Sequence, residues 1–328
     1  MKKYGLDLLD RKILYELDKN SRMTFKQLGK KIGISKETAT FRVKRLVKNK
    51  YIKNFITTIH TSNLNRFYYK LFYKFYGTTP EIDREIVDYI QNYQSVAYFA
   101  SSEGRYDVLF LILAKDMRDL YKFLVLFRER FGGYILEQEI VTLPSVHRFN
   151  FRFFYEDGEL LHTKYPVELV EPRIDEMDYK IISEIAKNAR ISLTEIAKIT
   201  KTDINVIKYR MNKLKKSNII GTHVLEINFE KFGLQQIQIG YTLKNHKSIN
   251  KMIEYVAQNP KSTFATVMLG KYDLAVEFFV ENMEELRRIM NGIKKEFSGD
   301  ITNHDVFILK EHTLNWFPYK LGNFETKE

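Results

Sequence analysis

The stretch Leu6-Asp7-Leu8-Leu9-Asp10-Arg11-Lys12-Ile13-Leu14 decides how this chain is organised, because it recurs as Ile174-Asp175-Glu176-Met177-Asp178-Tyr179-Lys180-Ile181-Ile182. Further along, Gly104-Arg105-Tyr106-Asp107 recurs in the same order as Gly270-Lys271-Tyr272-Asp273. A period of this length is far too long for a solenoid. The sequence therefore predicts one two-domain unit that is present twice.

The composition bounds the class of protein. The 328 residues are 44% hydrophobic and 29% charged, as in globular proteins with sizeable cores. The absence of cysteine excludes disulfides, iron–sulfur clusters and thiolate zinc sites. No stretch approaches the roughly 18 apolar residues of a membrane span, and the chain reaches Asp7 before an apolar signal segment could form. We therefore expect a cytoplasmic protein with no membrane partner.

The positive charge is unevenly distributed. A net charge of +12 and a pI near 9.4 favour a polyanionic partner such as nucleic acid, with an evenly basic surface as the alternative. Residues 1–60 hold sixteen Lys and Arg against five Asp and Glu, whereas residues 171–230 hold eleven against nine. The first copy therefore carries nearly all of the excess.

Each copy opens with a helical region. Apolar residues at helical spacing predict three short helices, the third from Lys36 to Asn49 with Ser35 as its N-cap. A short strand follows over residues 51–61. This order predicts winged helix-turn-helix domains over 1–60 and 173–231.

The remainder of each copy has the order βαββαβ, which is the ferredoxin-like arrangement. In the first copy a helix over Met117–Phe131 ends at Gly132-Gly133, and the final strand covers Tyr134–Leu143. We place these domains at 61–145 and 232–328, with a strand extension and linker over 146–172. The predicted fold class is α+β, with the two kinds of domain alternating.

In this arrangement the sequence resembles the Lrp/AsnC (leucine-responsive, feast/famine) transcriptional regulators. The resemblance rests on Leu9-Asp10-x-x-Ile13-Leu14, Asn20-x-Arg22, the segment Leu28 to Ser35, Arg42-x-x-x-Leu46, and Gly-x-Tyr-Asp on the later hairpin. It implies a DNA-binding domain followed by a RAM effector domain, twice in one chain. Members of the family usually carry one unit per chain and pair their RAM sheets face to face.

The third helix of each predicted helix-turn-helix is the candidate DNA-binding element, where cations neutralise phosphates and polar groups reach base edges. A solvated basic face is the alternative, and Arg42 and Arg210 could instead form internal ion pairs. The second copy replaces the turn Gly33-Ile34-Ser35 by Lys201-Thr202-Asp203, so altered DNA binding or a structural role is open for it. The predicted contacts are Ser35, Lys36, Thr38, Thr40, Arg42, Lys44, Arg45, Lys48, Asn205, Lys208, Tyr209, Arg210, Asn212 and Lys213.

The repeated Gly-x-Tyr-Asp has a structural explanation, since glycine suits the turn, tyrosine packs on the sheet and aspartate caps the turn. The resemblance implies in addition an effector site for a small amino acid at the interface of paired RAM sheets. The residues predicted to form it are Gly104, Tyr106, Asp107, Gly270, Tyr272 and Asp273.

Two histidines, His147 and His312, occupy corresponding positions beside aromatic residues. They could ligate a metal or haem, but a structural role is the expectation, and we predict neither a metal site nor a cofactor.

The sequence thus predicts a sequence-specific transcriptional regulator that binds double-stranded DNA, is modulated by a small molecule and is not an enzyme. The alternative is a sirohaem decarboxylase-like enzyme of tetrapyrrole biosynthesis, whose architecture is similar. The strands Val96–Ala100 and Thr263–Val267 lack the His and Arg expected of that enzyme. A co-regulator acting through protein contacts alone is a third possibility.

The uncovered face of each RAM sheet is rich in Phe, Tyr, Ile and Val and requires a partner. We therefore predict that the two RAM domains pair within or between chains and that the protein is at least a dimer.

Overall fold

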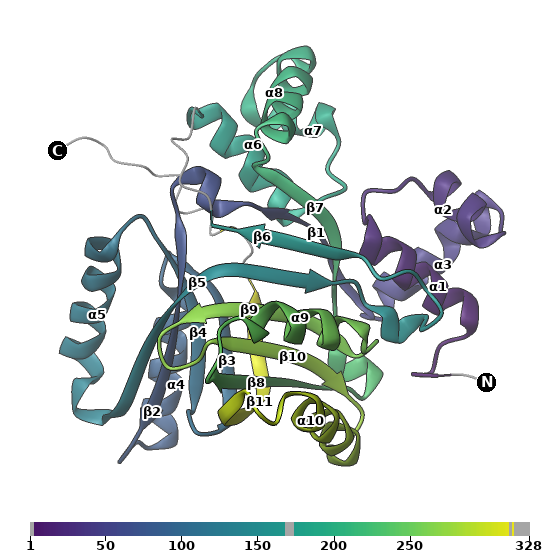
Figure 1. Cartoon of the computed structure of the whole chain (residues 1–328). Coiled ribbons are helices and arrows are strands. Elements are labelled where there is room, and N and C mark those ends of the chain that lie inside the picture. The colour runs from purple at the N-terminus through teal and green to yellow at the C-terminus, as the bar shows by residue number, and fades with distance from the viewer. Residues whose placement is uncertain (1–2, 168–173, 315–316, 318–328) are drawn as a thin grey trace.

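The computed structural model describes residues 3–167, 174–314 and 317 (Figure 1). Two helical modules lie on one side of a β-barrel, and helices flank the barrel. The first module contains α1 (Leu8–Lys19), α2 (Phe25–Ile32) and α3 (Lys36–Lys48). The second contains α6 (Glu176–Lys187), α7 (Leu193–Thr200) and α8 (Ile204–Lys216). Each module has its own buried core, so the predicted helix-turn-helix is present twice.

The strand that follows each module pairs with its counterpart in the other copy. Strand β1 (Ile52–Ile59) is antiparallel to β7 (Ile220–Ile227), with Ile56 opposite Val224. We call this pair the ribbon. It fastens the two modules to each other, which the sequence alone did not indicate.

Eight further strands close into a barrel. Around the barrel the order is β2, β4, β3, β11, β8, β10, β9 and β5, and β5 pairs again with β2. The strands are β2 (Phe67–Phe75), β3 (Val96–Gly104), β4 (Val108–Ala114), β5 (Ile135–Phe149), β8 (Gln235–Leu243), β9 (Ser262–Leu269), β10 (Leu274–Val280) and β11 (Ile301–Leu314). The two RAM domains thus pair within one chain, as one of the two predicted arrangements has it.

Two long strands make the closure. Strand β5 pairs first with β2 of its own copy and then, from Thr142 onward, with β9 of the other copy. Strand β11 does the same with β8 and then β3. The predicted strand over Tyr134–Leu143 and the extension predicted after it form one continuous strand, which reaches Phe149 because the second copy provides it with a partner. The region expected as a linker contains one more strand, β6 (His162–Pro166), which pairs with β5.

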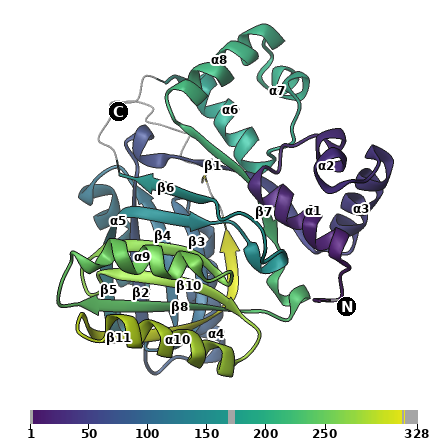
Figure 2. The same ribbon diagram turned by 45° about the vertical axis from the view of Figure 1, so that its right-hand side comes forward.

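Four helices cover the outside of the barrel: α4 (Pro80–Asn92), α5 (Met117–Phe131), α9 (Ser248–Gln258) and α10 (Met283–Phe297) (Figure 2). The helix-facing sides of the strands form two separate cores, one for each copy. A third core fills the barrel and includes Phe72, Tyr106, Tyr272 and Phe307. Four 3-10 turns complete the described elements: η1 (Thr61–Leu64), η2 (Gly132–Tyr134), η3 (Arg152–Phe154) and η4 (Phe229–Phe232). The predicted α+β class is confirmed.

Candidate nucleic-acid interface

Helix α3 has one buried and one basic side. Ser35 caps it by accepting a hydrogen bond from the Thr38 amide, at 3.0 Å. Ala39, Val43 and Leu46 face the core, whereas Lys36, Lys44 and Lys48 are exposed. The basic side is therefore available to a phosphate backbone, which lysines bind as point charges.

The turn before this helix has the same backbone shape in both copies. Gly33 adopts a φ of 75°, and its counterpart Lys201 adopts a φ of 52°, in the left-handed region that costs a non-glycine residue about 1 kcal/mol. Asp203 caps α8 by accepting from the Asn205 amide, at 2.7 Å. The loss of the turn glycine therefore leaves the helix-turn-helix geometry intact.

Four predicted DNA contacts are tied into ion pairs inside the modules. Arg42 donates to Asp7 and to the buried Asp10, which also accepts from Arg45. In the second module Arg210 and Lys213 repeat this arrangement around Asp178. The hydrogen bond from Arg210 also holds the pKa of Asp175 below its usual range. These four cations therefore brace α3 and α8 against the first helix of their modules.

The other predicted contacts are on the open side of the two helices. Thr40 donates its hydroxyl to the carbonyl of Lys36, a local contact within α3. Thr38, Asn205, Lys208, Tyr209 and Asn212 are exposed. Phe41 and Tyr209, at corresponding positions, are exposed by 66% and 71%, and only Tyr209 was among the predicted contacts.

The placement of charge differs between the two open sides. At an offset of 168 residues, Lys36, Lys44 and Lys48 correspond to Ile204, Asn212 and Lys216. Conversely, α8 exposes Lys208 and Lys215 at positions where α3 has Thr40 and Val47. Each helix therefore exposes three lysines, and the two open sides differ in where the positive charge is placed, not in its amount.

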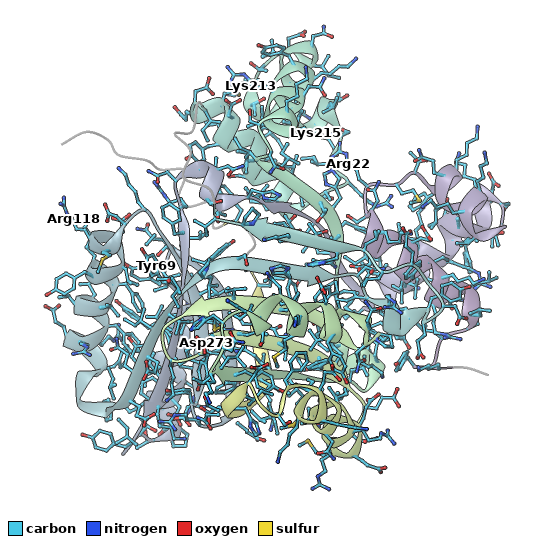
Figure 3. All side chains as sticks on the ribbon, in the orientation of Figure 1. Arg22, Tyr69, Arg118, Lys213, Lys215 and Asp273 are labelled. Carbon is cyan, nitrogen blue, oxygen red and sulfur yellow. The ribbon has the colours of Figure 1, made fainter. Side chains whose placement is uncertain are left out.

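Two arginines hold the modules side by side, an arrangement that sequence reasoning missed. Arg22 donates to the carbonyls of Ala189 (2.7 Å) and Ile191 (3.1 Å), and Arg190 donates to the carbonyl of Met23 (2.9 Å). Figure 3 shows Arg22 reaching from the first module toward the second. The repeated motif Asn-x-Arg was the available signal, since it places one such arginine in each copy.

The Gly-x-Tyr-Asp residues are at the junction of the two copies. Gly104 has a φ of 138°, and a side chain there would meet the carbonyl oxygen of Val306 at 2.4 Å. Tyr106 and Tyr272 are fully buried in the barrel. Asp107 accepts from the Phe75 amide (2.8 Å), and Asp273 accepts from the Leu243 amide (2.6 Å). The tyrosines pack inside the barrel as expected, whereas each aspartate bonds to a neighbouring strand and does not cap its own turn. Ligand binding at the motif stays a prediction.

His147 has a partner that the sequence did not reveal. Its Nδ1 lies 2.7 Å from Nε2 of His162, and burial lowers the pKa of His147 to about 4. His312 belongs to β11, but its side chain lies outside the described residues.

Among the described residues, no three His, Asp or Glu side chains converge in a way that could hold a metal ion. Nor does that part of the chain contain a helix long and apolar enough to cross a membrane.

Comparison with known proteins assigns the modules. The winged helix-turn-helix DNA-binding family matches residues 6–53 and 174–220. An uncharacterized HTH-type transcriptional regulator of Pyrococcus abyssi is 29% identical over 135 residues, which cover 41% of this chain and 92% of the relative. The HTH-type transcriptional regulator Ptr1 of Methanocaldococcus jannaschii is 31% identical over 119 residues, covering 36% of this chain and 79% of Ptr1.

One solved structure matches both copies together. The siroheme decarboxylase NirDL superposes over 97% of each chain with a TM-score of 0.66, at 12% sequence identity. At this identity the match extends to the fold alone. The two regulators, in contrast, align in sequence over less than half of this chain. The chain therefore belongs to the HTH-type transcriptional regulators, with the winged helix-turn-helix DNA-binding domain present twice, and it is a DNA-binding regulator.

Proposed function

We propose that this chain recognises a specific operator with two unequal recognition helices, α3 and α8, and has no catalytic activity. The observation that carries the proposal is the different set of exposed side chains at matched positions of the two helices. Two identical helix-turn-helix units related by a twofold axis read palindromes. Two unequal units held together by Arg22, Arg190 and the ribbon would read two different half-sites.

Selection from a random duplex library with the full chain tests this proposal. We expect enrichment of one site whose halves differ in sequence. A perfectly palindromic site, or no enrichment over the input library, would contradict it. In the same experiment Phe41→Ala and Tyr209→Ala should each relax preference in one half only, because each aromatic belongs to one helix.

The similarity of fold to NirDL supports an enzymatic alternative, a decarboxylase acting on a sirohaem-like tetrapyrrole. Titration with sirohaem separates the two functions, since binding at a defined site changes the Soret band. We expect no saturable Soret change and no release of carbon dioxide. Both signals, in a chain that selects no DNA sequence, would establish the enzyme instead.

The proposal has three further parts: an amino-acid effector at the Gly-x-Tyr-Asp hairpins, assembly into at least a dimer, and a cytoplasmic location. Internal pairing of the RAM domains already covers the apolar faces that called for a partner. The dimer therefore depends on other surfaces, and light scattering at micromolar concentration tests it. A strictly monomeric mass would contradict the proposed dimer.

For the effector, at least one amino acid of a panel should raise the melting temperature of the wild-type protein. If no amino acid of the panel raises it, the hairpins have only their structural role.

A further inference from the structure

A cavity of about 190 Å³ lies between the ribbon and the barrel. The ribbon contributes residues such as Thr58 and Leu225, and the inward faces of the barrel strands contribute Tyr98, Leu143 and Phe264. An apolar cavity of about 150 Å³ is known to accommodate a benzene molecule. This one therefore has room for a ligand slightly larger than a single ring. We call it the axial cavity, because the two copies meet around it.

Buried polar groups collect on one wall of the axial cavity. Lys70, only 4% exposed, donates to Gln238 at 2.5 Å, and Gln236 donates to Glu277 at 3.1 Å. The Tyr98 hydroxyl and the Oε1 atom of Gln236 are buried without a hydrogen bond of good geometry, although these two side chains are neighbours. Buried polar atoms nearly always have a partner, and without a ligand the Tyr98 hydroxyl and the Gln236 side chain are placed to supply it to each other.

Lys70 is the exceptional group in this set. No salt bridge to it occurs within the described residues, and Glu277 provides only a longer-range attraction. Another cation of the cavity lining, Arg148, is already paired with Asp18. A buried ammonium without a directly bonded anion is costly, and a bound anion would remove that cost.

The polar wall exists because the two copies have diverged around their shared axis. In the first copy Lys70 lies opposite Leu111 in the strand register, and in the second copy Gln238 lies opposite Glu277 in the same way. A symmetric dimer would present identical groups from both sides of such an axis. Only a duplication, whose two halves can differ in sequence, can place a lysine on one side of the axis and a glutamine on the other. The divergence is specific, because neighbouring core positions such as Tyr106 and Tyr272 remain identical.

From these observations we infer that the axial cavity is a binding site for a small apolar carboxylic acid, with the carboxylate on Lys70 and the apolar body against the opposite wall. The Tyr98 hydroxyl would donate to the same carboxylate. Neither the hairpin residues nor the recognition helices belong to this site. Because the ribbon forms part of the wall and joins the two DNA-binding modules, an occupant would also contact the element that sets their relative position.

Phenylacetate and its neutral isostere phenylacetamide test the inference. Isothermal titration of the full chain without DNA should show saturable binding of phenylacetate at millimolar concentration and at least tenfold weaker binding of phenylacetamide, as expected for a charge-assisted hydrogen bond. Equal affinities for the two compounds, or no binding of phenylacetate, would overturn it. Because no DNA is present, the outcome is independent of the proposed operator recognition.

Variants copied from the other half of the chain make the test specific. Lys70→Gln places at this position the residue that the second copy has, and it should reduce phenylacetate affinity about tenfold to a hundredfold. Glu277→Leu places there the residue of the first copy and should strengthen binding, since a buried carboxylate near the ligand is removed. Lys122→Gln on the exposed side of α5 is the matched control and should leave affinity unchanged. Thermal unfolding verifies that each variant folds. Folded Lys70→Gln protein with wild-type affinity for phenylacetate would overturn the inference.

Discussion

Replacing Lys36, Lys44 and Lys48 together by alanine tests whether the exposed lysines of α3 contact DNA phosphates. The three side chains are exposed, and none takes part in a salt bridge within the described residues, so the core of the module should not change. Each lysine that neutralises a phosphate contributes about 0.9 to the slope of log affinity against log salt. Three of them predict a slope reduced by about 2.7. If these contributions vanish at 1 M salt, affinity at about 0.15 M salt falls by roughly two orders of magnitude.

The second copy provides the matched comparison. Its corresponding residues are Ile204, Asn212 and Lys216, of which only Lys216 is charged. Replacing these three by alanine should reduce the slope by about 0.9 and the affinity at the same salt by about fivefold. Lys294→Ala with Lys295→Ala, on a helix of the barrel's outer surface, should have no effect.

Fluorescence anisotropy with a labelled duplex of arbitrary sequence is sufficient, because phosphate neutralisation does not require the operator. The slope is measured over a salt series for the wild type and the three variants, and thermal unfolding checks that each one folds. Equal slope changes for the α3 variant and the matched α8 variant, or an unchanged slope for the α3 variant, would refute the prediction that Lys36, Lys44 and Lys48 neutralise phosphates.

Three further predictions concern the bracing contacts and pH. Arg42→Ala leaves the buried Asp10 with a single partner, so urea unfolding should show a loss of about 2 kcal/mol, and an unchanged midpoint would contradict the bracing role. Arg22→Ala removes hydrogen bonds between the modules and should weaken operator binding while the salt slope stays constant; a changed slope would mean that Arg22 contacts phosphate. Burial, reinforced by nearby Arg22 and Lys215, lowers the pKa of His223 from 6.5 to about 4. The unfolded chain therefore binds the extra proton first, stability falls as pH drops from 6.5 toward 4, and His223→Gln should flatten that decline in thermal unfolding; an equally steep decline would contradict it.

Local sequence signals predicted the individual elements well. The helix over Met117–Phe131 has the predicted bounds, because Asp116 caps its start and Gly132-Gly133 follows its end. The aromatic alternation after Leu143 predicted the extension of β5, but not its pairing with β9, because strand pairing across the two copies leaves no mark on a local pattern. The β1–β7 ribbon escaped prediction for the same reason.

The candidate site could be predicted only in part. Spacing identified the exposed lysines of α3, but it could not separate them from Arg42 and Arg45, which turn toward Asp10. Lys70 falls in a run of aromatic residues and has the appearance of a solvated strand position. A comparison of the two copies position by position identifies it, because Lys70 corresponds to Gln238 whereas its neighbours Tyr69 and Leu71 correspond to the apolar Ile237 and Ile239.

The exchange of β5 and β11 between the copies has a consequence for synthesis on the ribosome. While the first copy emerges, β1 has no partner strand and the end of β5 has β6 on one edge only, because β7 and β9 have not yet been translated. Unpaired strand edges readily join another chain, so nascent first copies on neighbouring ribosomes are exposed to mutual pairing. Strand β11, the last one made, is also the one that joins β8 to β3. The barrel therefore closes only near the end of translation, and a chain truncated before β11 is left with two open edges.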